Sequence, residues 1–138
     1  LPGLERLNCL LRDRVDPRQE HSSALAHDLG ELLEILRAEQ IAPIALGIHA
    51  RRVVEQLVLH SLRDVPHQGR LSLYGGIRQL RKRGANRWLI SCLDQVREFG
   101  NWMGHPQADG QQRQVQLYDV LAVLSSLQRV LEEYPWTV

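Results

Sequence analysis

Several features that would place a protein in a special class are missing from this chain. Its 138 residues contain no secretory signal pattern and nothing approaching the roughly 18 consecutive apolar residues of a membrane span. Two cysteines, Cys9 and Cys92, do not suggest a disulfide framework, and we expect a reducing cytoplasm. The first residue is Leu rather than Met, so we also expect a segment of a longer protein. The sequence predicts a cytoplasmic protein that does not enter a membrane.

Patterns for metal and cofactor binding are missing as well. The histidines lack the spacing of zinc ligands, and no Glu-x-x-His pair of the di-iron kind is present. Gly75-Gly76 suggests a phosphate loop, but the residues around it do not match a nucleotide fingerprint. We therefore predict no metal and no cofactor. The acidic residues of the second predicted helix are interpreted as a solvated face: Asp28, Glu31, Glu34 and Glu39.

Alternating strand patterns are missing too, whereas helical periodicity runs through most of the chain. Apolar residues recur three and four positions apart, as on one face of a helix. Pro17 and Pro43 sit at expected helix starts, Asn86 can cap a helix, and Pro135 ends the last one. The predicted helices span residues 4–13, 18–40, 43–64, 72–83, 87–104 and 113–133. The sequence thus predicts an all-α fold, an antiparallel bundle of four to five helices.

Acidic residues are entirely missing from residues 65–93, although the whole chain carries a net charge of only +1. This basic block has a charge of +6, from Arg70, Arg78, Arg81, Lys82, Arg83 and Arg87. Clustered basic residues of this kind attract nucleic-acid phosphates, although they also occur on ordinary solvated faces. The candidate nucleic-acid-binding residues are Arg78, Arg81, Lys82, Arg83 and Arg87.

The stretch that follows the basic block carries the most chemistry. Arg97, Asn101 and His105 stand four residues apart, so a continuing helix would place them along one stripe. Gly100 and Gly104 interrupt this helix at a cost of about 1 kcal/mol each relative to Ala. We expect them to mark either the close approach of another backbone or the end of the helix.

These three side chains suit phosphodiester chemistry without a metal. A histidine can transfer protons near neutral pH, an arginine can hold a phosphate through two hydrogen bonds, and Asn101 can orient the histidine or a substrate hydroxyl. RNA supplies its own nucleophile, the 2′-hydroxyl. Arg97 and His105 are about 12 Å apart along a helix. The long Arg side chain can close part of that gap, and two copies related by a two-fold axis could close the rest and form one composite cleft. The structural alternative is that Arg97 pairs with Asp94, Asn101 bonds a backbone group and His105 caps its helix.

The pattern Arg97-x-x-Gly100-Asn101-x-x-x-His105, with Arg51-Arg52-Val53-Val54-Glu55 upstream, resembles the HEPN superfamily (higher eukaryotes and prokaryotes nucleotide-binding). It is most similar to an uncharacterised prokaryotic branch with the signature R-x-x-G-N-x-x-x-H. The resemblance covers roughly residues 40–134. We therefore divide the chain into an N-terminal helical extension, residues 1–39, and an HEPN-like bundle, residues 40–138.

The resemblance implies a helical domain, usually a homodimer, of a prokaryotic phage-defence or toxin–antitoxin protein. Its implied partners are RNA, an antitoxin or a fused effector domain. Many members are metal-independent endoribonucleases with four to six residues between Arg and His, whereas seven separate Arg97 from His105. Two hypotheses follow: a dimeric module that binds RNA, or a ribonuclease that uses Arg97, Asn101 and His105.

Overall fold

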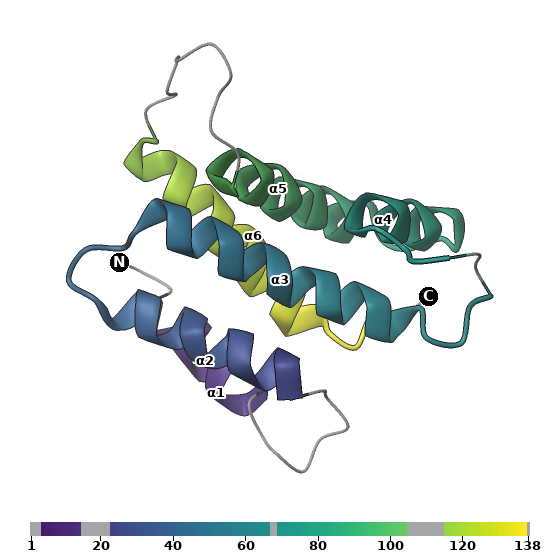
Figure 1. Ribbon diagram of the computed structural model, residues 1–138, viewed down its shortest axis with the longest axis horizontal. Helices are drawn as coiled ribbons and strands as arrows, with labels where there is room; N and C mark the ends of the chain where they lie inside the picture. Colours follow the sequence, from purple (N-terminus) through teal and green to yellow (C-terminus); the bar gives the residue numbers. More distant parts are fainter. Residues whose placement is uncertain (1–3, 15–22, 67–68, 105–114, 138) are drawn as a thin grey trace.

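The computed structural model describes residues 4–14, 23–66, 69–104 and 115–137, and it is built entirely from helices in these ranges (Figure 1). The helices are α1 (Leu4–Arg14), α2 (Ser23–Arg37), α3 (Pro43–Ser61), α4 (Leu73–Lys82), α5 (Arg87–Gly104) and α6 (Leu117–Glu133). The all-α class is confirmed. The described residues form six helices, including the ten-residue α4, which is more than the four to five expected for the bundle, although each helix overlaps one of the six predicted spans.

Side chains at the helix starts explain where several helices begin. Pro43 occupies the first turn of α3, and the Ser72 hydroxyl accepts a hydrogen bond from the Gly75 backbone N–H at 3.0 Å. The Asn86 side chain accepts one from the Trp88 backbone N–H at 2.8 Å, as the sequence predicts. Gln116 and Asp119 form a reciprocal capping box, so α6 begins at Leu117 rather than at residue 113.

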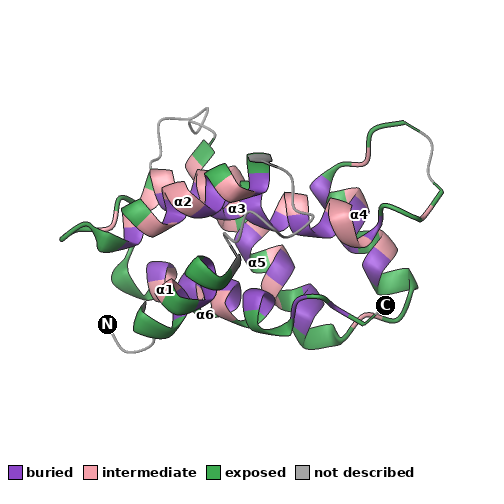
Figure 2. Cartoon of the chain, turned by 90° about the horizontal axis from the view of Figure 1, so that it is seen from below, coloured by how far each residue is buried: buried purple, intermediate pink, exposed green. Residues whose placement is uncertain are grey.

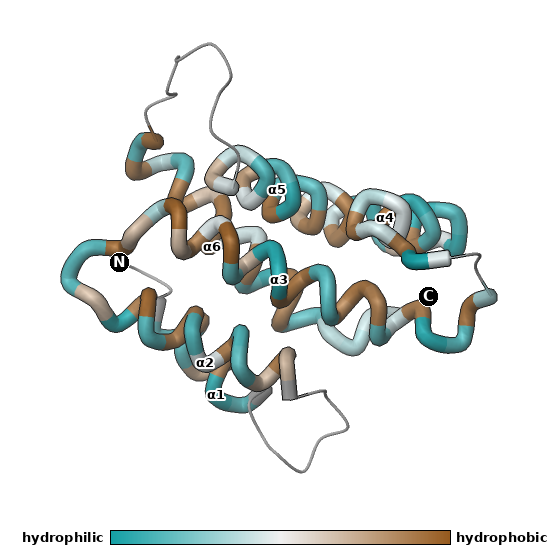
Figure 3. Tube along the Cα trace, in the orientation of Figure 1, coloured by the Kyte–Doolittle hydropathy of each residue, from teal (hydrophilic) through white to brown (hydrophobic). Residues whose placement is uncertain are grey.

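One hydrophobic core joins all six helices. Its largest fully buried side chains are leucines: Leu7, Leu11, Leu29, Leu32, Leu46, Leu57, Leu62, Leu73, Leu80, Leu93, Leu127 and Leu131. Buried residues lie on the inward sides of the helices in Figure 2, and Figure 3 shows hydrophobic and hydrophilic residues alternating along each helix. Helices α1 and α2 contribute to the same core, and they contact α6 and α3 respectively.

One sequence interpretation about burial is wrong, and one large apolar residue lies outside the core. Ile44 is 60% exposed in the first turn of α3. Asp28, interpreted as part of a solvated face, is only 5% exposed because α3 packs over it. Its carboxylate accepts a hydrogen bond from Gln56 and contacts His49 Nδ1 at 3.4 Å. The buried carboxylate is therefore paired, as buried charges generally are.

None of the described helices combines the length and apolar character that a membrane crossing requires. Helices α3 and α5 pack against each other more extensively than any other pair, and they run antiparallel, with Gly47 near Met103 and Arg51 near Gly100. Helix α5 also contacts α4 and α6. The contacts with these three helices therefore determine which partners the polar side chains of α5 have.

Candidate functional site

The Arg97 side chain lies between α5 and α4 and is 17% exposed. Its guanidinium contacts Asp94 at 3.3 Å and Glu98 at 3.5 Å, and it lies 5.3 Å from the centre of the Tyr74 ring. The ion pair with Asp94 is the structural alternative that the sequence left open, and it is confirmed. Arg97 is therefore already neutralised in part before any ligand binds.

Asn101 has a different neighbour, although it lies one helical turn further along α5. Its Oδ1 accepts a hydrogen bond from Nε of Arg51 on α3 at 2.9 Å, and Arg51 Nη1 contacts Glu55 at 3.1 Å. The expectation that Asn101 bonds a backbone group is wrong for its side-chain oxygen. Arg97 and Asn101 thus belong to two separate clusters, one toward α4 and one toward α3. The third residue of the predicted set, His105, lies outside the described residues.

Glycine makes the contact between α3 and α5 possible. A Cβ atom built on Gly100 would lie 2.6 Å from Arg51 Cβ and 2.8 Å from the Gly47 carbonyl oxygen. A Cβ on Gly47 would lie 2.7 Å from the Met103 side chain. The predicted close approach of a second backbone is confirmed at Gly100. We call this contact the glycine seam: Gly47, Arg51, Gly100, Asn101 and Met103.

The five predicted nucleic-acid-binding residues are all exposed, on α4, on the turn after it and at the first residue of α5. We call them, together with Tyr74, the basic surface: Tyr74, Arg78, Arg81, Lys82, Arg83 and Arg87. Tyr74 is 54% exposed, and the Arg78 guanidinium lies 5.8 Å from its ring centre. Arg97 approaches the same ring, so one exposed aromatic ring has two guanidinium groups beside it.

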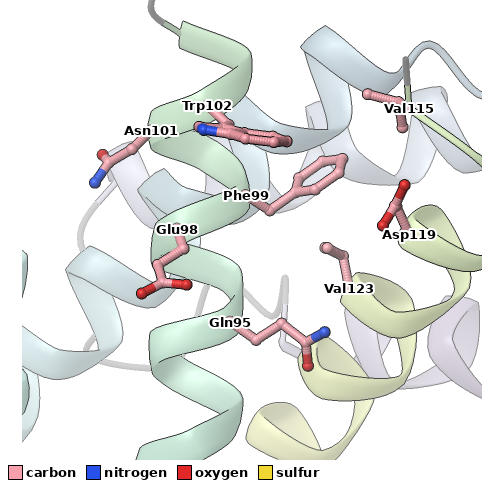
Figure 4. Close-up of a pocket in the computed structure, with 8 residues that line it drawn as sticks. All are labelled: Gln95, Glu98, Phe99, Asn101, Trp102, Val115, Asp119 and Val123. Carbon is pink, nitrogen blue, oxygen red and sulfur yellow. The ribbon is translucent and has the colours of Figure 1, made fainter. Parts of the chain in front are cut away.

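A cavity of about 410 Å³ lies between α5 and α6. In Figure 4 the Phe99 and Trp102 rings lie close together on α5, and Val115, Asp119 and Val123 lie across from them. The charged residues in its lining are the acids Glu98 and Asp119. This lining repels phosphates, so the cavity does not extend the basic surface. The Asn101 side chain points away from the Phe99 ring.

The sequence analysis missed Arg51, Glu55 and Tyr74 as site residues. The spacing of four between Arg51 and Glu55 is typical of a helical ion pair, and this signal was present in the pattern that resembles HEPN proteins. Tyr74 had no comparable signal, because its exposure depends on how α4 packs. Within the described ranges, no three His, Cys, Asp or Glu side chains gather as metal ligands would.

No family model matches the chain, and neither the curated proteins nor the solved structures include a match to it.

Proposed function

We propose that the chain is an HEPN-like dimeric module of a prokaryotic defence or toxin-type protein, and that it binds RNA through the basic surface. The observation that carries the proposal is the exposed Tyr74 ring with Arg78 and Arg97 beside it, on a helix without an acidic residue. Resemblance to the HEPN superfamily supports the dimer and the biological setting.

The chemistry of the basic surface suits single-stranded RNA. Exposed arginines form charge-assisted hydrogen bonds with phosphate oxygens, and an exposed aromatic ring offers a stacking platform for an unpaired base. Asp94 contacts both Arg81, at 3.6 Å, and Arg97. This carboxylate holds two guanidinium groups in place while Arg78, Lys82 and Arg83 remain exposed. The surface therefore combines phosphate contacts with stacking.

The first test replaces charge on the basic surface. Changing Arg81, Lys82 and Arg83 together to Ala should weaken binding of a labelled single-stranded RNA, measured by fluorescence anisotropy. The plot of log association constant against log salt concentration should become less steep, by about 2 in slope, if all three residues contact phosphates. The matched control changes three exposed arginines of α1 and α2, Arg6, Arg12 and Arg37, to Ala. Equal RNA affinity in the two triple variants would overturn the proposal.

The second test isolates stacking. Tyr74→Ala should weaken RNA binding by about 1–3 kcal/mol, the usual contribution of one base stacked on an aromatic ring. Tyr74→Phe keeps the ring and should bind like the parent chain. A loss in both variants would mean that the hydroxyl group, rather than the ring face, contacts RNA.

The alternative function is a metal-independent endoribonuclease that uses Arg97, Asn101 and His105. The observation that favours it is the Asn101 amide, which is half-buried and whose oxygen is held by Arg51. His105 would take the proton of the 2′-hydroxyl as that oxygen attacks phosphorus and would then give a proton to the leaving 5′-oxygen, so that a 2′,3′-cyclic phosphate and a 5′-hydroxyl end form. RNA cleavage in EDTA that is lost in His105→Ala would support this function. Intact RNA after incubation with the purified dimer would exclude it and leave the binding module.

A separate measurement tests whether the chain forms the proposed dimer. Sedimentation equilibrium should give a mass near 32 kDa, twice the 15.8 kDa of the chain, at micromolar concentration. A monomer at all concentrations would remove the dimer from the proposal but would leave RNA binding to the anisotropy measurements.

A further inference from the structure

A second cavity, of about 260 Å³, lies between α3 and α5, next to the glycine seam. It is lined by Ile48, Arg51, Arg52, Gly100, Asn101 and Gly104. Gly104 leaves room at the end of α5, since a Cβ atom on it would meet no described atom within 4 Å. The basic surface contributes no residue to this cavity, so the two are separate features.

Hydrogen bonding inside the seam leaves donors for a ligand. Since the Asn101 oxygen accepts from Arg51 Nε, the amide NH₂ group is the part of that side chain left to donate. The Arg51 group Nη1 contacts Glu55, whereas Nη2 has no hydrogen bond to a described residue. Arg52 is exposed, and it has no ion-pair partner in the described part of the chain.

The charges favour an anion. Arg51 and Arg52 contribute two positive charges, and the Glu55 carboxylate beside them contributes one negative charge. The C-terminal end of α5 adds a partial charge of about −0.5, which is smaller than the remaining positive charge. Planar guanidinium groups bind phosphate oxygens through paired hydrogen bonds, and the amide can bond a further oxygen.

We propose that this cavity binds one phosphate group through Arg51, Arg52 and the Asn101 amide. Its volume lies just below the range of about 300–1,000 Å³ in which whole small-molecule ligands are enclosed, so a single phosphate group fits it better than an entire nucleotide. The phosphate can belong to an RNA strand or to a free mononucleotide. The site does not depend on the proposed role of the basic surface.

The probe is inorganic phosphate, followed by the backbone amide signals of Gly100, Asn101 and Gly104 in a ¹⁵N-labelled chain. Phosphate should shift these signals in a saturable manner, and chloride at equal ionic strength should not. Arg52→Gln should weaken binding about tenfold or more, the usual effect of losing a charge-assisted hydrogen bond. Arg12→Gln, which removes one exposed charge from α1, should leave the affinity unchanged. Equal weakening in both variants, or no saturable shift, would overturn the proposal.

A steric variant tests the cavity without changing charge. Gly104→Leu places a side chain at a position where a Cβ atom would meet no described atom within 4 Å, and it should abolish the phosphate shifts at Gly100 and Asn101 while the helical circular dichroism is unchanged. Undiminished phosphate binding in this folded variant would place the anion elsewhere and overturn the assignment.

Two further probes identify the source of the phosphate. Adenosine monophosphate should compete with inorganic phosphate if a free terminal phosphate is sufficient, whereas competition by a 5′-hydroxyl RNA 10-mer alone would assign the site to backbone phosphates. Failure of both probes to compete would overturn the proposal. The Arg81, Lys82 and Arg83 triple variant should retain phosphate binding, so failure of the basic surface and failure of this cavity are distinguishable.

Discussion

Helix α5 has two polar regions that lie side by side. One is sensitive to the size of its residues, and the other is sensitive to their charge. The glycine seam has no room for a larger residue, because Gly100 is buried against the Arg51 side chain and the Gly47 backbone. The region toward α4 depends on charge, because the Arg97 guanidinium contacts the Asp94 carboxylate and the Tyr74 ring there. A small change of shape should therefore damage the seam, whereas a change of charge should alter ligand binding on the basic surface with little effect on the fold.

The largest effect on stability is expected from Gly100→Ala. The new Cβ atom would lie 2.8 Å from a backbone oxygen, which cannot rotate away as a side chain can. Overpacking of this kind costs about 1–3 kcal/mol, and in an unhindered helix the same substitution would gain up to about 1 kcal/mol. We expect a net loss of about 1–2 kcal/mol in the free energy of unfolding, measured by urea denaturation.

Gly30→Ala is the matched control for this change. Gly30 lies within α2, and a Cβ atom there would meet no described atom within 4 Å. This variant should gain up to about 1 kcal/mol. Gly47→Ala should also lose stability, because its new Cβ atom would lie 2.7 Å from Met103 Cβ, an atom that side-chain rotation cannot move. If Gly100→Ala were as stable as Gly30→Ala, the seam would not be limited by volume.

A smaller effect is expected where the basic surface joins α5. Asn86→Ala removes the side-chain oxygen that accepts the Trp88 N–H, and the loss of such a cap typically costs about 1 kcal/mol. Asn86→Asp retains an acceptor and should restore most of the stability in the same urea measurement. Equal stability of the Ala and Asp variants would show that the cap does not stabilise α5.

Local signals in the sequence were sufficient to predict the helices but not the contacts between them. Pro43 and Asn86 mark helix starts because capping depends on residues close in sequence. The burial of Asp28 depends on Gln56, 28 residues away, and no periodicity reveals that contact. The periodicity likewise predicted the short α4 but not its packing on α3 and α5.

The candidate site likewise combines features that the sequence predicted with contacts that it did not. The charge of the basic block is a property of composition, and its exposure followed because charged side chains are seldom buried without partners. The spacing of four suggested that Arg97 and Asn101 would act together, but their partners lie on different helices. Arg51 was the missing element, because its contact with Asn101 joins residues 50 positions apart in the sequence.

The smallest effect on stability is expected from Arg81→Gln on the basic surface. The Arg81 and Asp94 side chains are 66% and 31% exposed, and their charged atoms are 3.6 Å apart. Exposed pairs of this kind contribute about 0–1 kcal/mol, so the variant should unfold within about 0.5 kcal/mol of the parent chain. A double-mutant cycle with Asp94→Asn would isolate the pair from the contact between Asp94 and Arg97. A coupling energy well above 1 kcal/mol would mean that Arg81 stabilises the packing of α4 on α5, and the distinction between a seam limited by volume and a surface limited by charge would no longer hold.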